Sequence, residues 1–86
     1  MPKRKQPKVI IRKLGKEKAW GQFIEDDNII EIDPRLRGKN KLGVYLHELY
    51  HWFKPDATEE EVLTFEAEFT EFLWRHNLRF VENHEK

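Results

Sequence analysis

The second half of this 86-residue chain contains two blocks in which apolar residues recur three or four positions apart, and this periodicity constrains the fold most strongly. Such spacing places the apolar side chains on one face of a helix. The blocks cover residues 40–53 and 58–76, and residues 54–57, Lys-Pro-Asp-Ala, interrupt the periodicity between them. Thr58 followed by Glu61 forms a capping box at the start of the second block. The sequence therefore predicts two helices joined by a short loop.

The first half of the chain predicts three short strands. Apolar residues gather at residues 9–11, 19–24 and 29–32, and the acidic segment 25–28 separates the second group from the third as a turn. Because short turns connect neighbouring antiparallel strands, we expect a meander. The predicted fold class is α+β, with a short three-stranded antiparallel sheet packed against two helices. The tail from Asn77 onward predicts a short edge strand or a packed extension.

Length and composition limit the domain organisation and the compartment. A chain of 86 residues allows one domain with one small core, which we place at residues 8–86. Residues 1–7 contain two prolines and three basic residues and are expected to form a flexible basic arm. The chain has no cysteine, which excludes disulfides and thiolate metal ligands. Charged residues make up 37% of the chain and no apolar run is long enough to span a membrane, so a cytoplasmic protein is predicted.

Within the first predicted helix, residues 47–51 read His-Glu-Leu-Tyr-His. Side chains four positions apart lie one above the other on a helix, so His47 and His51 can bind the same tetrahedral zinc ion. Glu48 then lies beside the metal, where a general base can take a proton from a zinc-bound water. The motif indicates a zinc-dependent peptidase. The alternative is that both histidines lie on an exposed helix face and bind no metal.

Catalytic zinc usually takes a third protein ligand, which this motif does not contain. Glu59, Glu60 and Glu61 occupy the first turn of the second predicted helix, where negative charge also suits the helix dipole. By their angles around an ideal helix, Glu59 and Glu61 flank the apolar direction, and Glu60 points away from it. His76 and His84 are further candidates for the third ligand.

At these residues the chain resembles the gluzincins, a group of zinc peptidases in which the motif helix is followed by a helix that supplies a glutamate ligand. The resemblance covers residues 28–76 and implies a minimal zincin-like domain. The segment Glu59-x-Glu61-Val62-x-x-Phe65 is similar to the Glu-x-Glu-Ala-Asn-x-Phe helix of peptidases related to phage repressor-cleaving proteins, which implies Glu59 or Glu61 as the ligand.

More loosely, residues 33–75 resemble small SprT-like proteins of bacteria and phages, in which two consecutive acids match Glu59 and Glu60. The chain departs from these families at Leu63, where an asparagine is expected, and it lacks the downstream histidine of SprT domains. Resemblance to gluzincins also implies that the third strand, residues 28–32, binds an extended peptide at its free edge.

The predicted function is therefore zinc-dependent hydrolysis of peptide bonds with Glu48 as the general base. So small a domain offers little surface for substrate, and we expect a selective or latent enzyme. The candidate donors to the oxyanion or the substrate are Tyr45, Tyr50, His76 and Arg79.

A different class of function is also consistent with the sequence. The basic residues are concentrated near the N-terminus, and acidic residues dominate from residue 56 onward. Such asymmetry is typical of a solvated tail, or of an arm that contacts nucleic acid or an acidic partner. The alternative to the peptidase is thus a non-catalytic metal-binding or interaction module whose contacts are made by Lys3, Arg4 and Lys5.

Overall fold

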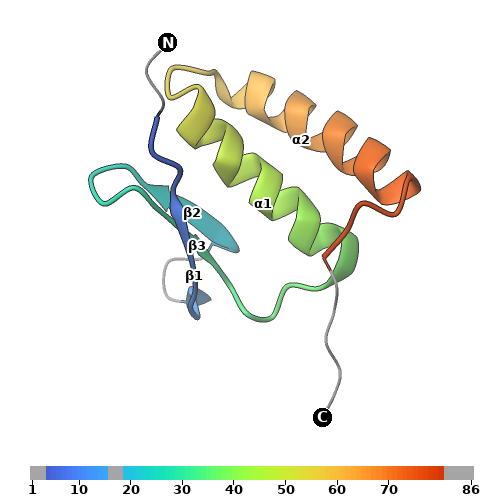
Figure 1. Ribbon diagram of the computed structural model, residues 1–86, viewed down its shortest axis with the longest axis horizontal. Coiled ribbons are helices and arrows are strands. Elements are labelled where there is room, and N and C mark those ends of the chain that lie inside the picture. Colours follow the sequence, from blue (N-terminus) through green and yellow to red (C-terminus); the bar gives the residue numbers. More distant parts are fainter. Residues whose placement is uncertain (1–3, 16–18, 81–86) are drawn as a thin grey trace.

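The computed structural model describes residues 4–15 and 19–80 and has the predicted α+β class. Three strands are followed by two helices (Figure 1). In chain order the elements are β1 (Lys8–Ile11), β2 (Gly21–Ile24), β3 (Ile29–Ile32), α1 (Gly38–Phe53) and α2 (Glu59–Arg75). Both helices lie where the apolar periodicity predicts them, because the two stripes and the loop between them are local signals. The N–H of Glu61 donates to the Thr58 hydroxyl at 3.1 Å, which confirms Thr58 as the cap of α2.

The sheet is mixed, so the predicted antiparallel meander is wrong in one pairing. The strand order is β1-β3-β2, with β1 parallel and β2 antiparallel to β3. The strand that follows β1 in the sequence thus lies at the far edge of β3, whereas a tight turn would have placed β2 next to β1. Leu14, which is fully buried, anchors the chain after β1, and its N–H donates to the Asp33 carboxylate at 2.9 Å.

The molecule has three layers, with α1 between the sheet and α2 (Figure 1). Helix α1 contacts β2, β3 and α2, whereas α2 contacts α1 and none of the strands. The core on the sheet side consists of Ile30, Ile32 and Leu36, with Val44 and Tyr45 of α1 packed against it. As a result, one strip along α1 lies between β2 on one side and α2 on the other.

The apolar stripe of α1 is buried only in part. Leu42 and Leu46 are buried, but Leu49 is 40% exposed and Phe53 is 61% exposed. Phe65 of α2 lies beside these two residues but leaves much of their surface exposed. Periodicity locates the face of a helix, but the neighbouring elements determine how far along the helix burial extends.

The segment that follows α2 packs against the rest of the domain. After α2, residues 77–80 form a turn and an irregular segment instead of a strand, and the Phe80 ring packs on Tyr45 with 4.4 Å between centroids. The described part of the tail, residues 77–80, is therefore a packed extension, and residues 81–86 lie outside the described residues. Among the described residues, neither helix is both long and apolar enough to cross a membrane.

Candidate metal centre

Three predicted ligands converge between α1 and the first turn of α2. His47, His51 and Glu59 each offer one ligand atom, and these atoms all lie within 4.8 Å of one another. His47 Nε2 lies 3.7 Å from a Glu59 carboxylate oxygen. Ligands at about 2.1 Å from a tetrahedral zinc lie roughly 3.4 Å from each other, so the His47–Glu59 distance is close to the spacing that zinc requires. Two imidazoles and a carboxylate are a donor set that zinc accepts.

Glu66 orients the first histidine and was missed by the sequence reasoning. Its carboxylate lies 2.8 Å from His47 Nδ1, which leaves Nε2 of the ring for a metal. A carboxylate in this position keeps the imidazole in one tautomer and one orientation. The signal was present in the sequence, since Glu66 follows Glu59 by seven residues, or two helical turns, and so lies on the same face of α2.

Gly43 makes room for this contact one turn before His47. A methyl group at this position would lie 3.0 Å from a Glu66 carboxylate oxygen and 3.4 Å from the Thr70 hydroxyl. Side chains of α2 therefore lie close against the backbone of α1 at this residue. Without a side chain at residue 43, α2 approaches α1 closely enough for Glu66 to reach His47.

Glu48 lies beside the two histidines and is 7% exposed. The pKa of Glu48 is raised to about 7, mainly by burial; His47 opposes this shift, and the nearby carboxylates of Glu59 and Glu66 add to it. Burial and the neighbouring His47 lower the pKa of His51, which favours the neutral ring that binds metals. A divalent cation at the three ligand atoms would oppose the effect of burial on Glu48, because positive charge favours the carboxylate.

Strand β2 forms the other wall of the site. A hollow of about 380 Å³ lies between Gly21–Phe23 of this strand and Glu48 and His51 of α1. Gly21 permits the approach, since a methyl group there would lie 2.5 Å from Val44 Cγ1 and 3.3 Å from Glu48 Cγ. The expectation that β3 presents a free edge to a peptide is wrong because β3 is the central strand. The free edge beside the site belongs to β2.

The neighbouring acids of α2 point elsewhere. The Glu61 carboxylate accepts hydrogen bonds from the Tyr50 hydroxyl at 2.7 Å and from Lys54 at 2.8 Å. Glu60 lines hollows on the side of α2 that also carries Thr64. Of the three candidate glutamates, only Glu59 is brought together with both histidines.

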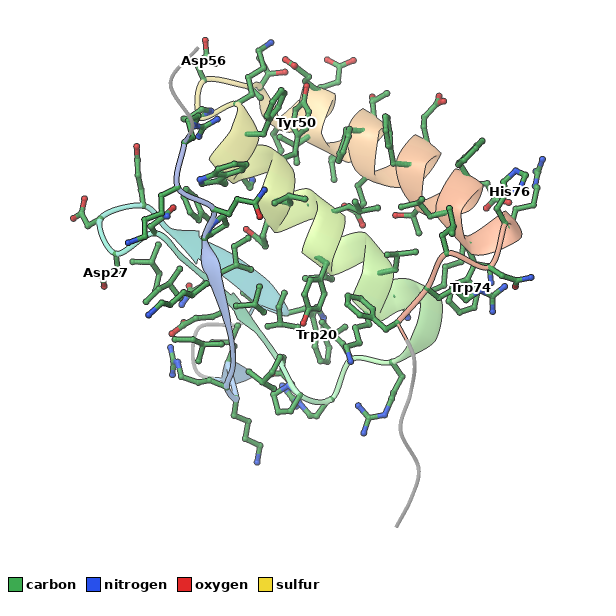
Figure 2. All side chains as sticks on the ribbon, in the orientation of Figure 1. Trp20, Asp27, Tyr50, Asp56, Trp74 and His76 are labelled. Atoms are coloured by element: carbon green, nitrogen blue, oxygen red, sulfur yellow. The ribbon has the colours of Figure 1, made fainter. Side chains whose placement is uncertain are left out.

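The predicted oxyanion donors lie away from Glu48. Tyr45 packs against the sheet core and Phe80, and Tyr50 stacks on Phe65 at 4.3 Å with its hydroxyl turned to Glu61. His76 lies at the C-terminal end of α2, at the opposite end of that helix from Glu59 (Figure 2). The candidate donors therefore do not gather at the site, because a sequence does not state which elements meet. Arg79 donates to the carbonyl oxygen of Trp74, and His84 lies outside the described residues.

The part of the basic arm that the structure describes contacts the body of the domain. The Arg4 guanidinium donates to the carbonyl oxygens of Trp52 and Phe53 at the end of α1 and lies 4.2 Å from the Trp52 ring. The carbonyl oxygen of Lys5 accepts a hydrogen bond from the Asn28 side chain at 3.2 Å. Arg4 thus neutralises the negative end of the α1 dipole. Lys3 lies outside the described residues.

Comparisons of the chain with protein-family models, with curated proteins and with solved structures found no match. The functional conclusion therefore depends on the chemistry of the site.

Proposed function

We propose that this protein is a zinc-dependent metallopeptidase that hydrolyses a restricted set of peptide bonds. The observation that carries the proposal is the convergence of His47, His51 and Glu59, with Glu48 buried beside them. His47, His51 and Glu59 would hold the metal. A bound zinc ion would supply Lewis acidity to a water molecule and to the substrate carbonyl.

The remaining chemistry belongs to this chain. The Glu48 carboxylate is the proton acceptor for the attacking water and returns the proton to the leaving amine. Glu66 keeps Nδ1 of His47 engaged, so the ring presents one nitrogen to the site. The edge of β2 can pair with an extended peptide and align it along the hollow beside Glu48.

Restricted specificity follows from the small number of residues that line the site. One short strand, part of one helix, and Glu25 and Pro55 from the neighbouring loops line the hollow at Glu48, and they provide few pockets for side chains. We expect slow digestion of casein and similar general substrates. Fast digestion would contradict the selective part of the proposal. The cytoplasm remains the predicted compartment, on the high charged content of the sequence.

Metal content tests the site before any substrate is known. After exposure to zinc and desalting, the wild type should retain one zinc per chain by elemental analysis. His47→Ala and Glu59→Gln should retain much less, whereas Glu60→Gln, one residue further along α2, should behave as the wild type. A wild-type protein that retains no zinc would refute the proposal.

Glu48→Gln then separates hydrolysis from metal binding. This variant should keep its zinc and lose roughly 100-fold to 10,000-fold in the rate of peptide hydrolysis, the usual contribution of a general base. Equal rates for the wild type and Glu48→Gln would instead favour a metal-binding module without catalysis.

A further inference from the structure

A second hollow, of about 670 Å³, continues along α1 from the metal centre toward the start of that helix. Its floor includes Asn40, Gly43 and Val44 of α1, and Trp20 lies at its edge just before β2. Glu66 lines this hollow and also contacts His47, so the hollow adjoins the metal centre directly. A peptide bound beside Glu48 and extended along α1 would pass over it.

One wall of the second hollow carries positive charge. Arg35, Arg37 and Lys39 all line it. Arg35 is paired with Asp33 at 2.8 Å, and Lys39 is paired with Glu71 at 2.6 Å. The Arg37 guanidinium differs, because within the described chain it donates only to carbonyl oxygens, those of Pro34 and Leu36. Its charge is therefore available to an anionic ligand.

The start of α1 favours an anion at the same place. The helix begins after Arg37 without a side-chain cap and has no acidic residue in its first turn, whereas α2 has Thr58 as a cap and three glutamates. The first N–H groups of a helix lack partners within it and carry partial positive charge. Lys39 and Asn40, from this uncapped turn, line the hollow.

The α2 wall adds a polar group that has no partner. Thr70 is 7% exposed and lines the hollow, and its hydroxyl makes no hydrogen bond within the described structure. Leaving such a group unpaired costs free energy, which an acceptor on a ligand can recover. The two carboxylates that line the hollow, Glu66 and Glu71, are already engaged by His47 and Lys39.

We infer that this hollow binds a carboxylate of the substrate, about three residues to the C-terminal side of the cleaved bond. Asn40 precedes His47 by seven residues, which is roughly 10 Å along a helix and about three residues of an extended peptide. Trp20 lies at the start of β2, so a peptide antiparallel to β2 has its C-terminal side over this hollow. The inference rests on the proposed peptidase function.

The carboxylate can come from two sources, an acidic side chain or the C-terminus of the peptide. Synthetic peptides that the wild type cleaves distinguish them. In one arm, Glu is compared with Gln at each position after the cleaved bond, in peptides with an amidated end. In the other arm, peptides that end three residues after the bond carry either a free or an amidated C-terminus.

We expect faster cleavage when a carboxylate lies near the third residue after the cleaved bond. The increase in rate should be roughly threefold to tenfold at low salt and smaller at high salt, because salt screens partly exposed charges. Arg37→Glu should abolish this preference and favour Lys at the same position. Lys8→Glu changes the net charge equally on an exposed residue of β1, outside the hollow, and should leave the preference unchanged. The absence of a carboxylate preference at every position after the cleaved bond would overturn the inference.

A binding measurement keeps this test apart from the proposed function. Fluorescein-labelled Glu and Gln peptides are titrated with the Glu48→Gln protein without zinc, and anisotropy reports binding. Tighter binding of the Glu peptide, lost in the Glu48→Gln/Arg37→Glu protein, supports a carboxylate site in this hollow. If the zinc-loaded wild type nevertheless cleaves nothing, the peptidase proposal alone fails. Equal binding of both peptides overturns the inference, whatever the enzyme cleaves.

Discussion

Gly21→Ala tests whether β2 lies directly against α1 beside Glu48. The backbone of Gly21 does not have a positive φ, so alanine meets no conformational barrier there, and the steric contact alone determines the cost. The new methyl group would lie 2.5 Å from Val44 Cγ1, against about 3.5 to 4.0 Å for an ordinary carbon contact, so the strand must move by about 1 Å.

The cost of this movement outweighs the benefit of alanine. Overpacking a well-packed contact costs about 1 to 3 kcal/mol, and replacing glycine by alanine returns about 0.4 to 1 kcal/mol through the unfolded chain. Val44 is β-branched and therefore stiff within a helix, so it gives little. We expect Gly21→Ala to lower the free energy of unfolding by about 1 to 2 kcal/mol, or the Tm by roughly 5 to 15 °C for a domain of this size.

Urea and thermal unfolding followed by circular dichroism measure this effect, with Gly15→Ala as the control. At residue 15 the nearest atom to an added methyl group is a nitrogen of Arg35 at 3.9 Å, an ordinary contact, so stability should stay the same or rise slightly. Val44→Ala should relieve the clash, so the double variant should be more stable than the sum of the single effects by at least about 0.5 kcal/mol. Equal stability of Gly21→Ala and Gly15→Ala, or additive effects with Val44→Ala, would refute the packing of β2 on α1.

Three further predictions concern the zinc ligands, the start of α2 and acid stability. Glu66→Ala should weaken zinc binding about 10-fold to 100-fold in competition with a chromogenic chelator, because His47 loses its orienting partner. Glu66→Gln keeps a hydrogen-bond acceptor and should lose less zinc affinity. Unchanged zinc affinity in Glu66→Ala would exclude the orienting role. Thr58→Ala should lower the free energy of unfolding by about 1 kcal/mol in urea titrations, since the cap of α2 is lost, and Thr58→Ser should restore most of it. Hydrogen bonds from Arg35 and from the Leu14 N–H hold the pKa of Asp33 well below its ordinary value of 3.8. A carboxyl whose pKa is depressed in the folded state stabilises the fold fully above its unfolded pKa and loses that contribution as the pH falls. The free energy of unfolding should therefore decline below about pH 4. Asp33→Asn should flatten that decline, and an unchanged acid dependence in this variant would contradict the assignment.

Local spacing was sufficient to predict several features of this protein. The two apolar stripes predict α1 and α2, the Thr58 cap marks the start of α2, and the acidic turn at residues 25–28 predicts the hairpin between β2 and β3. The same kind of reasoning places His47 and His51 on one face of α1, next to each other. These features depend on residues within one element or one turn, so the sequence determines them without knowledge of the neighbours.

Contacts between distant parts of the chain decided the rest. The strand order β1-β3-β2 puts β3 in the centre of the sheet, so the free edge beside the site belongs to β2. The packing of α2 on α1 brings Glu59 to the histidines and Glu61 to the Tyr50 hydroxyl. Residues only two positions apart thus have different roles. Burial of apolar groups from distant parts of the chain sets which elements meet, and helical periodicity alone does not predict these contacts.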